Sequence, residues 1–209
     1  PAMYYDESAG SDISGDNPQQ QEYKVYCGQG YPDGYELFKS SLEKCMRKNA
    51  SDVYNPRLAH MLIAMCNSVS DDKNMHETLE NFGFDKEKRV NGIYLTYNIA
   101  TKQMEEETLV LVVIRGTKSV WEWASNFDTS TNEQYQHTGF SDSAKELYDN
   151  MADFLDTENF SNGKYKFVIT GFSRGAAVAN ILAARLLDEQ VAQKNVYAYT
   201  FACPDVAAI

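Results

Sequence analysis

The stretch of sequence that decides the fold is YKFVITGFSRGAAVANILAARLL, residues 165–187. Residues 165–170 are rich in β-branched and aromatic side chains, which is typical of a strand, and residues 176–187 are rich in alanine and leucine, which is typical of a helix. Between them, Gly171 and Gly175 flank Ser173 in the pattern G-x-S-x-G. A tight turn that brings a strand close to a helix needs residues without a Cβ. The stretch therefore predicts a strand–turn–helix unit with Ser173 at the turn.

Helix and strand patterns alternate on both sides of this unit. The apolar run at 109–114 predicts a strand buried on both faces, residues 196–201 predict another strand, and residues 144–155 form a helical stripe that Ser143 and Glu146 open at capping-box spacing. Further upstream, helices are expected over 35–46, 56–69 and 75–82, and a strand with one solvent-facing side over 93–99. Alternating strands and helices imply crossover connections, so we expect an α/β fold with a mostly parallel sheet flanked by helices.

Composition sets the scale of the molecule. The chain has 209 residues with 19 basic and 30 acidic side chains, a net charge of −11, which fits one domain and argues against nucleic acid as a partner. Residues 1–23 carry five acidic side chains and no lysine or arginine. We therefore expect an acidic, loosely ordered arm over 1–23 and a single domain over 24–209.

Metal, cysteine and membrane signals are weak. The four cysteines lack C-x-x-C spacing, which favours thiols packed in a reduced protein over a secreted disulfide framework, although the compartment stays open between the two. His76, Glu77 and Glu80 form the only grouping that suggests a metal, and their spacing lacks a ligand geometry. No apolar run has the length of a membrane span. We expect no metal, no cofactor and no transmembrane segment.

Chemistry is expected at Ser173. At a strand-to-helix turn its hydroxyl would stand above the carboxyl ends of the strands, and the N–H of Arg174 at the start of the helix could stabilise an oxyanion. Thr117 follows the buried strand at 109–114 through Arg115 and Gly116, where a second oxyanion donor belongs. Without that chemistry, the pattern would be a glycine-rich turn only.

Trp121 and Trp123 follow on a short amphipathic segment. We expect them to form a lid or a wall for the acyl chain of a substrate, and for at least one of them packing in the core is an equal alternative.

Four motifs in order resemble those of the class 3 lipases, the fungal-type triacylglycerol lipases, and in particular lipase-like proteins of anaerobic Gram-positive bacteria. They are Val113-Ile114-Arg115-Gly116-Thr117 with Trp123, His137-Thr138-Gly139-Phe140, Gly171-Phe172-Ser173-Arg174-Gly175-Ala176 and Thr200-Phe201-Ala202-Cys203-Pro204. The resemblance covers residue 93 to the end of the chain. It implies an α/β-hydrolase fold, Ser173 as the nucleophile, Thr117 and Arg174 as oxyanion donors, a structural role for His137, and a lipid or other carboxyl ester as substrate.

The turn at residues 171–176, called the nucleophile elbow (or elbow) because it would present Ser173, departs from the family's common sequence at Phe172, Arg174 and Ala176, which leaves the head group of the ester open. The larger departure concerns the catalytic triad, the set of serine, acid and histidine that such enzymes use. In α/β-hydrolases the acid and then the histidine follow the serine, but His60, His76 and His137 all precede Ser173. Of the acids that follow it, Asp188, Glu189 and Asp205, none is assigned to the triad.

Three explanations of the missing histidine stay open. The chain is a fragment of a longer hydrolase, the product of a shortened gene, or a noncatalytic descendant that binds lipid or protein. The end of the chain directly after a core strand favours the first, with a domain incomplete at its C-terminus. A sheet that ends there would expose an edge, through which two copies could pair as a homodimer.

Overall fold

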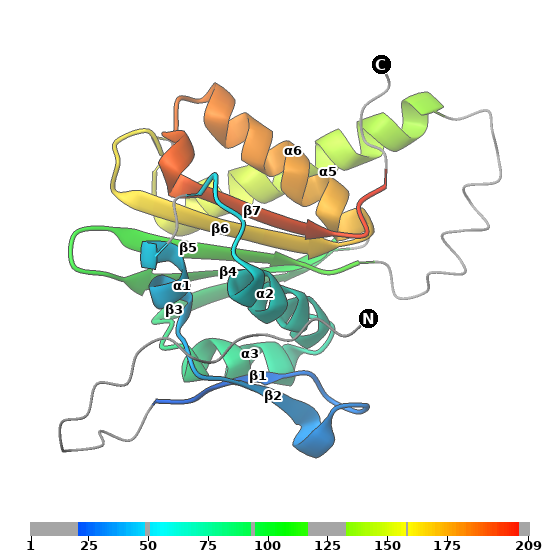
Figure 1. Ribbon diagram of the computed structural model, residues 1–209. Coiled ribbons are helices and arrows are strands. Elements are labelled where there is room, and N and C mark those ends of the chain that lie inside the picture. The colour runs from blue at the N-terminus through cyan, green and yellow to red at the C-terminus, as the bar shows by residue number, and fades with distance from the viewer. Residues whose placement is uncertain (1–20, 49–50, 93–94, 117–132, 158, 205–209) are drawn as a thin grey trace.

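The structure is a computed structural model that describes residues 21–48, 51–92, 95–116, 133–157 and 159–204 (Figure 1). A two-stranded hairpin comes first, and the strands β3 to β7 then form one sheet in sequence order. The strands are β1 Tyr23–Tyr26, β2 Tyr35–Phe38, β3 Lys86–Asn91, β4 Thr96–Gln103, β5 Thr108–Ile114, β6 Tyr165–Phe172 and β7 Val196–Phe201. The helices are α1 Leu42–Lys48, α2 Pro56–Ser68, α3 Asp72–Asn81, α5 Glu133–Leu155 and α6 Arg174–Asp188, with 3-10 turns at Pro32–Gly34 and Gln193–Asn195.

The five-stranded sheet is mixed. Strands β5, β6 and β7 run parallel, whereas β3, β4 and β5 pair antiparallel. Helix α6 connects β6 to β7 as a crossover, as the alternation of elements predicts. The α/β class is confirmed, with the parallel part of the sheet limited to β5–β7.

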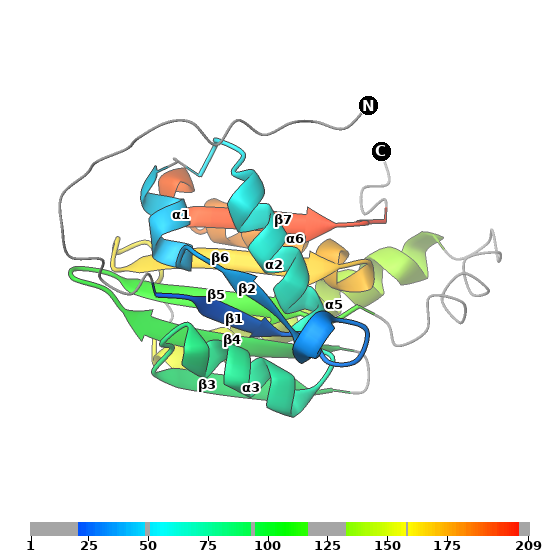
Figure 2. The same ribbon diagram turned by 60° about the horizontal axis from the view of Figure 1, so that its bottom comes forward.

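Helices cover both faces of the sheet. Helices α5 and α6 lie on one face, and α1, α2, α3 and the β1–β2 hairpin lie on the other (Figures 1 and 2). Strand β5 shows why its sequence is apolar throughout. Val110, Val112 and Ile114 pack under α5 and α6, while Leu109, Leu111 and Val113 pack on the opposite side.

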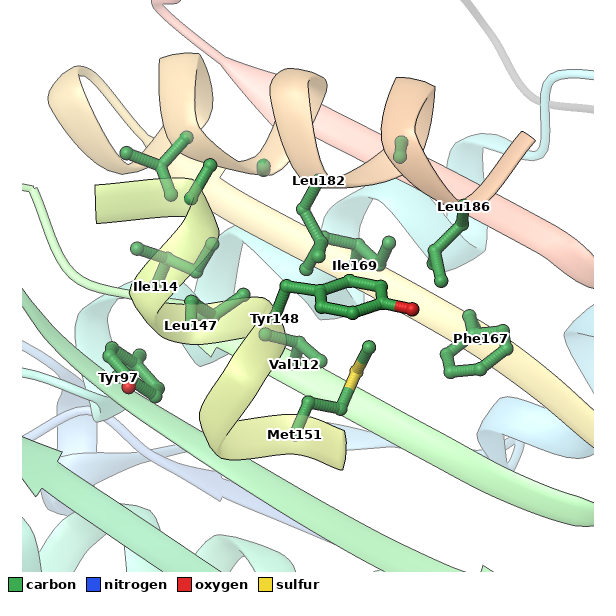
Figure 3. Close-up of a cluster of buried hydrophobic side chains, with 14 of the residues drawn as sticks. Tyr97, Val112, Ile114, Leu147, Tyr148, Met151, Phe167, Ile169, Leu182 and Leu186 are labelled. Carbon is green, nitrogen blue, oxygen red and sulfur yellow. The ribbon is translucent and has the colours of Figure 1, made fainter. Parts of the chain in front are cut away.

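The core beneath α5 and α6 holds the strand that leads to Ser173. Leu147, Tyr148 and Met151 from α5 and Leu182 and Leu186 from α6 meet Val112, Phe167 and Ile169 of the sheet (Figure 3). Phe167 and Ile169 are fully buried. Strand β6 is therefore packed between the helices on the two faces of the sheet up to the turn at Ser173.

Most expected elements are confirmed where the apolar pattern is long. The strands expected at 109–114, 165–170 and 196–201 are β5, β6 and β7, and the helices expected at 56–69 and 176–187 are α2 and α6. Helix α2 begins at Pro56, and the Asn55 side chain accepts hydrogen bonds from the N–H groups of Arg57 at 3.0 Å and Leu58 at 3.3 Å.

The helix expected over 35–46 is wrong in its first part. Tyr35–Phe38 is strand β2, which pairs antiparallel with β1, and the helix begins only at Leu42. Its apolar residues also fit helical spacing, and the pairing with a distant strand overrides that local pattern.

The solvent-facing side expected for the strand near 93–99 is also wrong. Residues Leu95 to Ala100 are all buried, because Tyr97 and Ile99 pack under α5 while Ala100 packs on the opposite face. The polar Asn98 is buried there because its Oδ1 accepts a hydrogen bond from Arg89 Nη1 at 2.7 Å.

The helix start expected at Ser143 lies inside α5, which begins ten residues earlier at Glu133. The Ser143 hydroxyl donates to the carbonyl oxygen of Gly139 at 2.8 Å, a bond typical of serine within a helix rather than at its cap.

The termini add two observations. Residues 1–20 of the expected acidic arm lie outside the described residues, while Tyr23 begins β1 and packs its ring 5.1 Å from that of Phe82. In the described sheet, β7 stands at one edge and β3 at the other. The pairing of two copies through an edge stays a prediction.

Candidate functional site

Ser173 occupies a strained turn between β6 and α6. Its backbone angles are φ 53° and ψ −121°, a region that residues with a side chain seldom adopt. Its N–H donates to the carbonyl oxygen of Phe201 in β7 at 2.9 Å, and its own carbonyl accepts from the N–H of Ala176 at 2.9 Å. The turn is thus tied to the neighbouring strand on one side and to the first turn of α6 on the other.

The two glycines of the elbow are required by close backbone contacts. A Cβ on Gly171 would lie 2.3 Å from the carbonyl oxygen of Gly175, and a Cβ on Gly175 would lie 2.6 Å from that of Ile114 at the end of β5. Neither atom can move aside without shifting the backbone. The glycines therefore let β6, α6 and the end of β5 meet around Ser173.

The end of β5 lies directly beside the elbow. Ile114 is in register with Gly171, so Arg115 and Gly116 come next to Phe172 and Ser173. A Cβ on Gly116 would lie 2.8 Å from the carbonyl oxygen of Phe172. The segment after β5 was expected to lie beside the elbow. Its described residues, Arg115 and Gly116, do lie there.

A pocket of about 400 Å³ opens at this place. The described residues that line it come from the C-terminal end of α2 and its following turn, from the end of β5 and from the elbow: Ile63, Cys66, Asn67, Ser70, Arg115, Gly116 and Phe172. Sequence patterns predicted helix α2 but contained no signal that its C-terminal end would reach the elbow. This contact depends on the path of α2 across the sheet.

Cys66 is the one thiol in this pocket wall. It is buried, and its sulfur lies 3.4 Å from Thr170 Oγ1. Burial raises the pKa of the Cys66 thiol to about 12, against the lowering effect of that hydrogen bond. The thiol therefore stays protonated at neutral pH.

The other expected site residues fall into two groups. Arg174 begins α6, and its guanidinium lies 5.9 Å from the ring centre of Phe140. The first N–H groups of a helix point out of its N-terminal end and lack partners within the helix, and the role of Arg174 as an oxyanion donor stays a prediction. Thr117, Trp121 and Trp123 lie outside the described residues, and their assignments stay predictions.

The histidines do not meet Ser173 among the described contacts. His60 Nε2 lies 2.6 Å from Glu36 in β2, and His76 Nδ1 lies 2.5 Å from Glu87 in β3. The hydrogen bond to Glu87 raises the pKa of His76. The backbone of His137 is part of α5. Across the described ranges, no residue forms a hydrogen bond with the Ser173 hydroxyl.

Metal-binding groups and membrane-spanning helices are absent among the described residues. No group of three or more His, Cys, Asp or Glu side chains among them could hold a metal ion. No helix in the described part of the chain combines the length and apolar character needed to cross a membrane. The four cysteines are thiols, with Cys45 and Cys66 buried, Cys27 half-buried and Cys203 exposed.

Known proteins resemble parts of the chain. Residues 111–209 match the family Lipase (class 3). A curated relative, the secreted mono- and diacylglycerol lipase 1 of Fusarium solani, is 33% identical over 94 residues, which are 42% of this chain and 28% of the relative. The chain therefore spans little more than a quarter of that lipase.

Solved structures of lipases also resemble it. A lipase from Rhizopus microsporus var. chinensis is 18% identical with a TM-score of 0.46, covering 72% of this chain and 59% of its own. The Rhizomucor miehei triacylglyceride lipase is 18% identical with a TM-score of 0.46, covering 70% of this chain and 62% of its own.

The matched residues include the last four residues of β5, the segment after it, and the complete β6–elbow–α6 unit around Ser173. Four ordered motifs, the strained serine and the two sterically required glycines lie within or across this range. Residues 111–209, which carry this unit, are therefore the part of the chain that is similar to the class 3 lipase family.

Proposed function

We propose that the protein is a serine carboxylester hydrolase of the lipase type, which acts on lipid or other carboxyl esters through an acyl-enzyme on Ser173. The observation that carries the proposal is the strained backbone of Ser173 between the end of a central parallel strand and the start of α6. A serine held at φ 53° and ψ −121° costs free energy, and backbone strain of this kind is concentrated at functional sites, which supports the proposal.

The reaction follows from this placement. Ser173 Oγ attacks the carbonyl carbon of the ester, a C–O bond forms, and the hydroxyl proton passes to a base. The carbonyl oxygen becomes an oxyanion, which the N–H groups at the start of α6, with Arg174 first, and the proposed donor Thr117 stabilise. When the C–O bond to the leaving alcohol breaks, the alcohol takes up a proton, and water later releases the acid and restores the serine.

The base is the part of the proposal that the described residues do not supply. His60 and His76 are hydrogen-bonded to Glu36 and Glu87, and no described side chain bonds to the Ser173 hydroxyl. The proposal therefore requires a base from residues outside the described ranges. The alternative is a noncatalytic module that binds lipid or protein on the same fold.

A fluorophosphonate probe distinguishes the two. It reacts with activated serines, so we expect one probe molecule per chain, located on Ser173 by peptide mass spectrometry, and no labelling of Ser173→Ala. Circular dichroism checks that both proteins are folded. A folded wild-type protein that stays unlabelled would overturn the catalytic proposal and favour the binding module.

A further inference from the structure

Arg115 lies in the wall of the pocket beside the elbow, and its side chain has no hydrogen-bond or ion-pair partner among the described residues. Its Nε is buried and makes no hydrogen bond, and no carboxylate of the described residues forms an ion pair with its guanidinium. Its only hydrogen bond among them is from its backbone N–H to the carbonyl oxygen of Thr96 at 2.9 Å. A guanidinium carries five donors and no acceptor, and the buried one of these, Nε, calls for an acceptor from elsewhere.

The neighbouring Arg89, in contrast, has hydrogen-bond or ion-pair partners for its guanidinium. Its Nη1 donates to Asn98, its Nη2 donates to the carbonyl oxygen of Val69 at 3.1 Å, and its Nε pairs with Asp72. Burial lowers the pKa of Arg89, and the charge of Arg115 acts in the same direction, against the raising effect of Asp72. The two guanidinium groups are therefore close enough to repel each other, and the carboxylate nearby is committed to Arg89.

The pocket is suited to an anion in other respects. None of its described lining residues is acidic, although the chain as a whole has a net charge of −11. Asn67 and Ser70 add polar side chains at the pocket rim, where both are exposed. Phe172, the residue before Ser173 in the chain, forms part of the same wall, so the pocket lies beside the elbow.

We propose that this pocket binds an oxyanion group of the substrate, a phosphate or a carboxylate, with Arg115 as the residue that sets this specificity. The inference rests on the proposed function, because it assigns the pocket to the ester that Ser173 would attack. A guanidinium binds such groups through paired hydrogen bonds, which a neutral polar head group cannot match. The preferred ester is then one with a negatively charged head group.

Three small probes of the same backbone test the charge requirement. Glycerol 3-phosphate and glycerate carry an oxyanion, and glycerol does not, so calorimetry on the folded protein should detect binding of the first two only. Arg115→Gln should weaken that binding by about tenfold or more, because it removes the charge and the paired donors. The matched control Arg57→Gln changes an arginine that lines a different pocket, and it should bind as the wild type does.

A second variant covers the case in which Arg115→Gln does not fold. Ser70→Asp adds a negative charge at an exposed rim position, where folding does not depend on the hydroxyl, and it should also weaken binding by about tenfold. Equal binding of all three probes, or unchanged binding in Ser70→Asp and in folded Arg115→Gln, would overturn the proposal, as would the absence of binding to the wild type.

Protection of Ser173 shows whether the anion belongs to the substrate or is a separate effector. Glycerol 3-phosphate should slow fluorophosphonate labelling of Ser173 at concentrations that saturate the pocket, and glycerol should not. Saturating binding that leaves the labelling rate unchanged would overturn the assignment to the substrate. Calorimetry measures binding without any reaction at Ser173. Absent binding therefore contradicts the anion pocket alone, and absent labelling contradicts Ser173 as the nucleophile alone.

Discussion

Replacing Gly171 by alanine is expected to lower the free energy of unfolding by about 3 kcal/mol, the upper part of the usual range for an overpacked core site. The added Cβ would lie 2.3 Å from the carbonyl oxygen of Gly175 and 2.4 Å from its carbonyl carbon. Both are backbone atoms of the first turn of α6, which is held against β5 and β7. The strain can be released only by moving α6 away from the sheet, and urea unfolding followed by circular dichroism measures the loss.

Gly139→Ala is the matched control for this substitution. Gly139 lies within helix α5, and a Cβ there would meet no atom within 4 Å. Alanine is the better helix former, so the control should raise stability by about 0.5–1 kcal/mol. Equal stability of Gly171→Ala and the wild-type protein would show that the elbow is not the close-packed turn described here.

Replacing Ser173 by alanine is expected to lower kcat/KM for a soluble p-nitrophenyl ester by at least about 1,000-fold, in any form of the protein that turns over esters. The reason is that no other described nucleophile is available at the elbow, since the Cys66 thiol is buried and protonated. Initial rates at several ester concentrations give the comparison. Ser173→Ala removes only the side-chain hydroxyl of a half-buried residue, so the midpoint of unfolding should stay nearly unchanged.

Ser161→Ala serves as the control, because it removes the same hydroxyl from an exposed loop residue. We expect its kcat/KM to equal that of the wild type. Residual turnover in Ser173→Ala within tenfold of the wild type would place the nucleophile at another residue.

The elbow could be predicted from sequence because it is local. A strand, a glycine-flanked serine and a helix follow each other within 23 residues, and each part has a distinct pattern over residues 165–187. The structure adds why the glycines are needed, since the atoms they would strike belong to Gly175 and to Ile114, the latter some sixty residues away in the chain.

The Arg115 pocket could not be predicted because it is built from distant segments. Arg115 was visible in the motif after β5, but Asn67 and Ser70 reach it only through the crossing of α2 over the sheet. The same limit explains strand β2, where the apolar residues of Tyr35–Phe38 fit a helix locally and only the pairing with β1 makes them a strand.

The most direct test of Ser173 as the nucleophile is the mass of the protein after brief exposure to a p-nitrophenyl ester and acid quenching. We expect one acyl group per chain, carried by the peptide that contains Ser173, and none on Ser173→Ala. A folded protein that acquires no acyl group, or acquires it equally with and without the Ser173 hydroxyl, would contradict the assignment of Ser173.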